Sequence, residues 1–204
     1  MREITAAAIT DCVRRLCLQA NRRLPADAEA ALRAAAENEP WPVASGILGE
    51  LCANLDAARE TELPICQDTG LVTVFAELGE DVHVSGFEEA VQEGVRRGYA
   101  EGYLRKSVVR DPLRRGNTGD NTPATIYLRL VPGDRLRLTV APKGAGSENM
   151  CAVKMLTPAD GEEGVRSFVL DVVKHAGGKP CPPVVVGVGI GGSFDSVPRL
   201  AKEA

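Results

Sequence analysis

The sequence predicts an α+β fold in which N-terminal helices pack around a mostly antiparallel sheet. Within the first 60 residues, apolar side chains recur at helical spacing and alanine is abundant. After Pro64, β-branched runs and apolar–polar alternation, both typical of strands, become frequent. No low-complexity linker separates these parts, so we expect one domain over residues 1–204.

Three helices are expected in the N-terminal part. In the first, Ile9, Val13 and Cys17 share one face, which makes Cys17 a core residue. The second follows Pro25, a residue suited to the first turn of a helix, and ends near position 39. The third is marked by apolar residues between positions 47 and 55, and Cys52 is expected to pack among them.

The clearest strand signal is a predicted β-hairpin. Residues 125–130 and 136–140 alternate apolar with polar side chains on either side of a turn at 132–134, which indicates one wet face. The other expected elements are a strand at 71–78, a helix at 87–103, a β-like stretch at 151–156 in which Cys151 packs, a helix at 162–175, a short buried strand at 184–188 and a helix that begins shortly before residue 204.

Composition excludes several classes of protein. With 24 Lys+Arg against 28 Asp+Glu, the formal net charge is −4, whereas a nucleic-acid binder carries a strong basic excess. No stretch approaches the ~18 consecutive apolar residues of a membrane span. The charged N-terminus does not match a secretory signal peptide, so a cytoplasmic location and reduced cysteines are expected.

Four polar, glycine-rich segments interrupt the predicted elements, at residues 64–70, 116–123, 143–149 and 179–192. Two cysteines lie in these loops rather than on apolar faces. Cys66 precedes Gln67 and Asp68, and Cys181 lies between Pro180 and Pro182. A stiff loop can hold a thiolate at a fixed point, as a metal or iron–sulfur site requires. The alternative is that both are ordinary buried thiols in tight turns.

Two further features fit the recognition of an anionic substrate. Residues 143–149 offer backbone N–H groups at Gly144, the charge of Lys143 and the hydroxyl of Ser147, which together resemble an anion cradle. Arg105 lies in a loop, where its guanidinium could pair with a carboxylate or serve as a solvated surface charge. The glycine run at 187–192 lacks the spacing of a dinucleotide-binding motif.

Together the four segments resemble the iron–sulfur hydro-lyases of the class I fumarate hydratase and tartrate dehydratase family. The residues that carry the resemblance are Pro-Ile-Cys-Gln-Asp-Thr-Gly at 64–70, Asn-Thr-Gly-Asp-Asn-Thr-Pro-Ala at 117–124, Lys-Gly-Ala-Gly-Ser-Glu-Asn at 143–149, and Cys-Pro-Pro at 181–183 with the following Gly-Ile-Gly-Gly. The match covers about residues 40–204 and is similar to the α-type, N-terminal portion of the family.

The resemblance implies a [4Fe–4S] cluster held by three cysteines, with one iron left open as a Lewis acid for reversible hydration of fumarate to malate. Cys66 and Cys181 fall on two of the ligand positions. The resemblance also implies that Asp68 orients substrate or relays a proton and that the substrate is a small dicarboxylate. The implied substrate-binding residues are Gln67, Arg105, Lys143, Gly144 and Ser147.

The family's third cluster cysteine falls beyond Ala204, so we expect the α-type catalytic domain over residues 1–204 to be incomplete at its C-terminus, with exposed apolar surface there. A β-type subunit or C-terminal domain would complete the site and supply the general base, and a dimer is expected. The alternatives are a tartrate dehydratase α subunit, a non-catalytic metal or thiol module, and an inactive fragment. No C-x-x-C pair is present, which argues against the thiol module.

Overall fold

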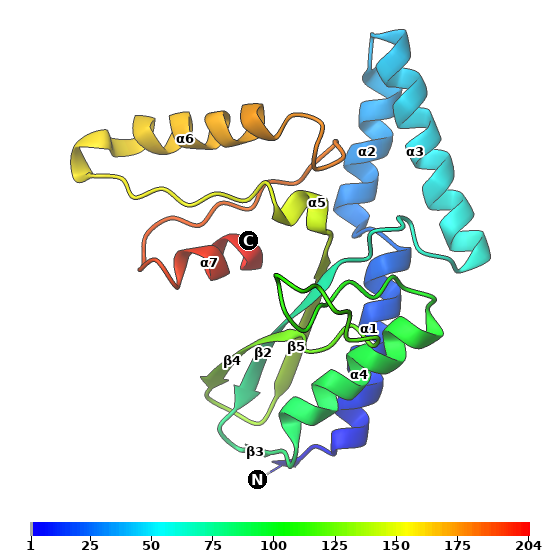
Figure 1. Ribbon diagram of the computed structural model, residues 1–204, viewed down its shortest axis with the longest axis vertical. Coiled ribbons are helices and arrows are strands. Elements are labelled where there is room, and N and C mark those ends of the chain that lie inside the picture. The colour runs from blue at the N-terminus through cyan, green and yellow to red at the C-terminus, as the bar shows by residue number, and fades with distance from the viewer. Residues whose placement is uncertain (1) are drawn as a thin grey trace. The chain divides into compact units, whose positions relative to one another are not determined.

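The computed structural model describes residues 2–204 and divides into two compact units, Met1–Lys143 and Gly144–Ala204 (Figure 1). Helices and a mixed sheet confirm the α+β class. The elements of unit 1 are β1 (Arg2–Glu3), α1 (Ala6–Arg22), α2 (Ala26–Asn38), α3 (Pro42–Thr61), β2 (Leu71–Gly79), β3 (Val82–His83), α4 (Phe87–Glu101), β4 (Thr125–Val131) and β5 (Leu136–Lys143). Those of unit 2 are α5 (Ala145–Glu148), a 3-10 turn η1 (Pro158–Asp160), α6 (Gly161–Ala176) and α7 (Val197–Glu203).

The three-stranded sheet of unit 1 has the order β4-β2-β5, so the predicted hairpin is wrong. Strands β4 and β5 both form, but each pairs with β2, β4 in parallel and β5 antiparallel. Val72, Thr73, Val74, Phe75 and Ala76 are buried in succession, as suits a central strand covered on both faces. Alternation of apolar and polar residues predicts that a strand exists but does not specify its partner. The pattern of β4 and β5 is therefore equally compatible with pairing to each other and with pairing to β2.

Gly79 lets the β4–β5 connection cross the end of β2. Its backbone N–H donates to the Arg135 carbonyl oxygen (2.8 Å), and the N–H of Asp81 donates to that of Gly133 (3.0 Å). A Cβ at position 79 would lie 2.2 Å from the Gly133 carbonyl oxygen. Only glycine therefore permits this close crossing.

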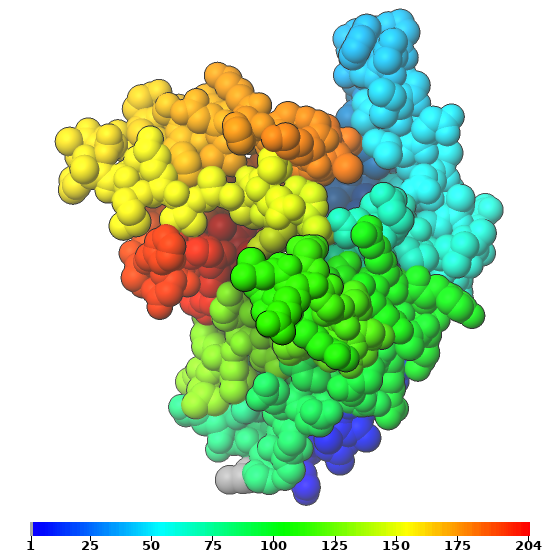
Figure 2. Space-filling view, in the orientation of Figure 1, coloured from blue at the N-terminus to red at the C-terminus, as the bar shows by residue number. Residues whose placement is uncertain are grey.

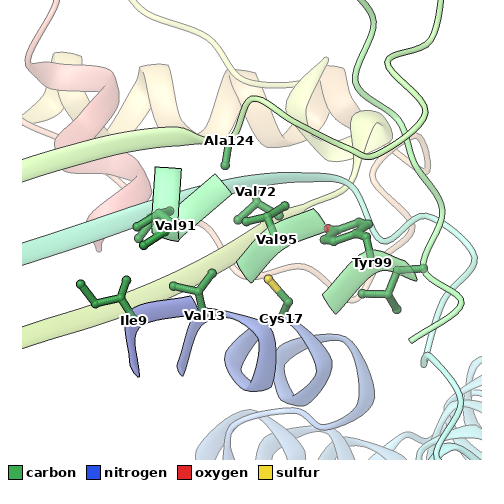
Figure 3. Packing of buried hydrophobic residues seen from close by; sticks show 11 residues of the cluster. Ile9, Val13, Cys17, Val72, Val91, Val95, Tyr99 and Ala124 are labelled. Atoms are coloured by element: carbon green, nitrogen blue, oxygen red, sulfur yellow. The ribbon is translucent and has the colours of Figure 1, made fainter. Parts of the chain in front are cut away.

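The core of unit 1 lies between the sheet and helices α1 and α4 (Figure 3). The predicted face of α1 is confirmed, since Ile9, Val13 and Cys17 are buried against Val91, Val95 and Tyr99 of α4 and Val72 of β2. Glycines at positions 94 and 98 of α4 allow this close approach, because a Cβ at either would meet α1 at under 3.0 Å. Helices α1 and α4 therefore pack closely along this line of contact.

Helices α2 and α3 confirm the remaining helical predictions of the N-terminal part. Arg33 and Arg59 bridge the two helices through Glu29 and Asp56, at distances of 2.6–3.5 Å. Cys52, expected to pack on α3, is partly buried. Within residues 2–204, no helix has both the length and the apolarity that a membrane crossing requires.

Unit 2 confirms the predicted helices as α6 and α7 but contradicts two predicted strands. Neither residues 151–156 nor residues 184–188 form a strand, and Cys151 is exposed rather than packed. Val185 is 90% exposed and Met155 is 75% exposed. A strand needs a neighbouring strand for its backbone groups, and the described residues of unit 2 provide none. The expected exposed apolar surface is therefore present in this unit.

Candidate functional site

Two of the four glycine-rich segments, together with Lys143, meet at one edge of the unit 1 sheet. Strand β2 begins at Leu71, directly after the loop 64–70, and the parallel strand β4 begins at Thr125, directly after the segment 116–124. Strand β5 runs the opposite way and ends at Lys143, which pairs with Leu71. The sheet topology therefore places Lys143 beside the loop that carries Cys66, Gln67 and Asp68.

The loop 64–70 presents an exposed cysteine on an anchored backbone. The N–H of Ile65 donates to the Asn21 carbonyl oxygen of α1 (2.9 Å), and Asn54 Nδ2 of α3 donates to the carbonyl oxygen of Ile65 (2.8 Å). Cys66 is exposed, and its Sγ accepts the backbone N–H of Asp68 at 3.4 Å. Its Sγ also donates to Gln67 Oε1 (3.5 Å), so these two contacts within the loop hold the sulfur at a fixed point. The alternative of a buried thiol is thus wrong for Cys66.

Arg105 lies next to this loop. Thr69 Oγ1 donates to the backbone carbonyl oxygen of Arg105 (3.1 Å), which ties the start of β2 to the segment after α4. Arg105 is exposed, and its guanidinium forms no hydrogen bond or ion pair with residues 2–204. Figure 2 shows the surrounding segment, residues 105–120 in green, on the surface of unit 1. The N–H donors of the Arg105 guanidinium are therefore open to a carboxylate ligand.

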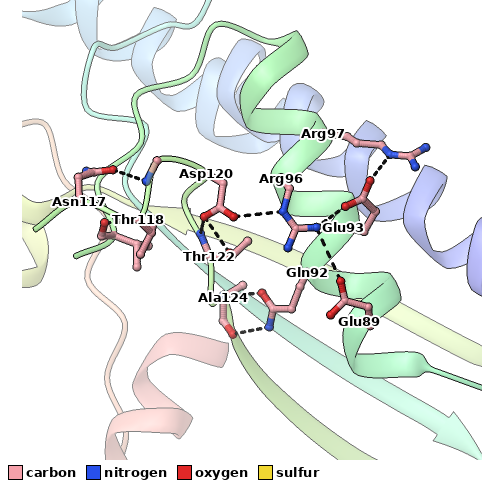
Figure 4. Close-up of polar contacts among 12 residues, drawn as sticks. Glu89, Gln92, Glu93, Arg96, Arg97, Asn117, Thr118, Asp120, Thr122 and Ala124 are labelled. Carbon is pink, nitrogen blue, oxygen red and sulfur yellow. Dashed lines mark hydrogen bonds and ion pairs between the residues drawn. The ribbon is translucent and has the colours of Figure 1, made fainter. Parts of the chain in front are cut away.

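The segment 117–124 is held against α4 by side-chain hydrogen bonds (Figure 4). Arg96 Nε donates to Asp120 Oδ2 (3.1 Å), and Gln92 pairs with both backbone groups of Ala124 (2.8 and 3.1 Å). Desolvation raises the pKa of the Asp120 carboxyl, but the Thr122 N–H and hydroxyl and the Arg96 guanidinium outweigh it and lower this pKa to about 2. Asp120 is therefore ionised and committed to structure at neutral pH. Sequence reasoning missed Gln92 and Arg96, since both read as ordinary helix-surface residues.

The other predicted site residues belong to unit 2. Gly144 directly precedes α5, and Ser147 Oγ donates to its carbonyl oxygen (3.0 Å), so this hydroxyl serves the local turn. Cys181 is exposed and has a left-handed backbone (φ 58°), and its N–H donates to the Gly178 carbonyl oxygen (3.2 Å). The alternative of a buried thiol is wrong for Cys181 as well.

The cysteine chemistry fits an iron–sulfur cluster in part. Cys66 and Cys181 are both exposed thiols on loops pinned by backbone hydrogen bonds, as cluster ligands require. Within residues 2–204, no group of three or more His, Cys, Asp or Glu side chains is gathered as a metal site. The described residues thus offer exposed cysteines but no assembled ligand set.

Comparisons with known proteins agree on one family. The sequence profile described as Fumarate hydratase (Fumerase) matches residues 10–204. The chain is 42% identical over 204 residues to the protein named "Putative L(+)-tartrate dehydratase subunit alpha" of Methanocaldococcus jannaschii, covering 96% of this chain and 71% of that protein. It is 28% identical over 200 residues to the L(+)-tartrate dehydratase subunit alpha of Escherichia coli strain UTI89, covering 96% of this chain and 66% of that one. The K12 strain protein of the same name is 27% identical with the same coverage.

Proposed function

Because the chain belongs to the fumarate hydratase (Fumerase) family, we propose that it is the α-type part of a hydro-lyase that adds water to, or removes it from, a small dicarboxylic acid. The observation that carries this proposal is the meeting of an exposed thiol loop, a free arginine and Lys143 at one edge of the sheet. An open guanidinium suits a substrate carboxylate, and an exposed thiolate suits a metal ligand.

Cys66 and Cys181 are the residues that would hold a [4Fe–4S] cluster, with the third ligand supplied from outside residues 1–204. When bound, the cluster supplies a Lewis-acidic iron that polarises the departing hydroxyl. The hydrogen bond from the Asp68 N–H to Cys66 Sγ supports the assignment of Cys66, because it fixes the position of an exposed sulfur in the loop.

The remaining residues bind and orient the substrate. Arg105 pairs with a carboxylate through two N–H donors, and Gln67 donates a hydrogen bond to a carboxylate oxygen. Asp68 follows both in the loop and orients the substrate or relays a proton. Lys143, Gly144 and Ser147 contribute positive charge, backbone N–H groups and a hydroxyl.

The names of the relatives favour L(+)-tartrate over malate as the hydroxy acid, and they favour a two-chain enzyme in which a β-type subunit completes the site. We therefore propose tartrate dehydration as the first activity to test and fumarate hydration as the second. A dimer of such α–β pairs in the cytoplasm completes the proposal.

The test is turnover of L(+)-tartrate and of fumarate by the chain assembled anaerobically with its β-type partner. Arg105→Lys keeps the charge but loses the two-pronged fork, so kcat/KM should fall about 10- to 100-fold, the equivalent of a charge-assisted hydrogen bond. Arg97→Lys is the matched control, because Arg97 is an exposed residue of α4 that pairs with Glu93. Absence of turnover with both acids, or equal effects of the two substitutions, would refute the proposal.

A further inference from the structure

Beneath the exposed loops of the site lies a set of buried polar side chains to which no role has been assigned. Asn121 and Tyr99 are 0% exposed and Thr69 is 4% exposed. A buried polar group is costly unless it is hydrogen-bonded. These three therefore require a structural account, which their partners provide.

Asn121 joins two loops that are far apart in the sequence. Its Oδ1 accepts the backbone N–H groups of Ser107 (2.7 Å) and Val108 (3.1 Å), and its Nδ2 donates to the Gly70 carbonyl oxygen (3.1 Å). Its backbone is left-handed, with φ 63°, a conformation that asparagine adopts more readily than most side chains. A carboxamide both donates and accepts, so asparagine meets every requirement of this position.

Thr69 joins the same two loops, and Tyr99 ties the first of them to α4. The Tyr99 hydroxyl, on α4, donates to the carbonyl oxygen of Thr69 (2.7 Å) and also lies 3.2 Å from that of Gly70. Thr69 Oγ1 in turn donates to the carbonyl oxygen of Arg105. Burial raises the pKa of the Tyr99 hydroxyl, which keeps it protonated as a donor.

We propose that Asn121 and Thr69 are positioning residues that fix the backbone of Arg105–Val108 against the loop of Cys66, Gln67 and Asp68. Asn121 itself does not contact the substrate, because it is fully buried and both of its side-chain polar atoms are engaged. The catalytic consequence rests on the proposed function, whereas the fastening of the loops stands on the contacts alone.

The fastening is tested by amide hydrogen exchange in the full chain, without any cofactor. Asn121→Gly tolerates the left-handed backbone and removes only the side chain. Exchange at the Ser107 and Val108 amides should rise by about tenfold, the change expected from one lost hydrogen bond. Val91→Ala is the control for general loss of stability, because Val91 is a fully buried residue of α4. Unchanged exchange at both amides, or an equal rise in the control, would overturn the inference.

The catalytic consequence is tested by a matched pair of substitutions in the assembled enzyme. Thr69→Val keeps the shape but removes the hydroxyl that holds Arg105, and Thr69→Ser keeps the hydroxyl. The valine variant should raise KM for the dicarboxylate about 3- to 10-fold, and the serine variant should restore it. Equal kinetics of the two variants would contradict a positioning role. Absence of turnover by the unmodified assembly would refute the proposed function, and the exchange comparison then decides the positioning role by itself.

Discussion

Substituting Gly94 by alanine should loosen the packing of α4 on α1. A Cβ there would lie 2.7 Å from Val13 Cβ and 2.8 Å from the Thr10 carbonyl oxygen. Ordinary carbon contacts are ~3.5–4.0 Å, so the two helices would have to separate by about 1 Å. Overpacking costs about 1–3 kcal/mol, and the contact with a backbone oxygen puts this case in the upper part of that range. The helix propensity of alanine offsets about 1 kcal/mol, which leaves a net loss of about 1–2 kcal/mol.

The same substitution at Gly49 provides a control of opposite sign. Gly49 lies inside α3, and a Cβ there has no atom within 4 Å, so only the propensity gain of about 1 kcal/mol remains. Urea unfolding of the chain, followed by far-UV circular dichroism, measures both effects. A Gly94→Ala protein as stable as the unmodified chain would refute the reasoning about this helix contact.

Three further predictions concern a buried thiol, a hydrogen-bonded carboxylate and a close backbone contact. Burial raises the pKa of the Cys17 thiol to about 12, so at neutral pH Cys17 should resist a thiol reagent that labels the exposed Cys66. Peptide mass spectrometry after labelling checks this prediction, and equal labelling of the two cysteines in the folded chain would contradict it. The pKa of Asp120 is about 2 in the folded chain against a reference of 3.8, so its contribution to stability is complete above 3.8 and is lost as the pH falls through 2. In Asp120→Asn, the free energy of unfolding should therefore fall by about 1 kcal/mol less on acidification than in the unmodified chain, after discounting for solvent screening. An equal fall in the two proteins would count against the assigned contacts of Asp120. Gly79→Ala, which would bring a Cβ to 2.2 Å from the Gly133 carbonyl oxygen, should lower stability by more than about 2 kcal/mol, and an unchanged urea midpoint would exclude the described strand crossing.

Local patterns predicted the helices well because each carries its own periodicity. Cys17 was identified as a core residue from helical spacing alone, and the structure buries it. The strands β4 and β5 were also predicted, but their pairing was not. The central place of β2 depends on a crossing that Gly79 permits, and nothing in the alternation of β4 or β5 encodes that contact.

The site was predictable as residue types but not as an arrangement. Cys66 and Arg105 were chosen from their loops and their resemblance to a family, and the structure brings these loops together through Thr69. The structural role of Asn121 could not be predicted, since the sequence does not distinguish a buried asparagine from one in a surface turn. In unit 2, residues 184–188 were expected to be buried because they are apolar, but burial needs a partner that the described residues lack.

The cluster assignment is the central claim, and anaerobic reconstitution with iron and sulfide, in the presence of the β-type partner, tests it most directly. We expect about four iron and four sulfide ions per chain, the content of a [4Fe–4S] cluster, and loss of this content in Cys66→Ala and in Cys181→Ala. Cys151→Ala is the matched control, because Cys151 is also an exposed thiol but lies outside the ligand positions. Full loading of both ligand variants, equal loss in the control, or no specific uptake by the unmodified protein would contradict the account.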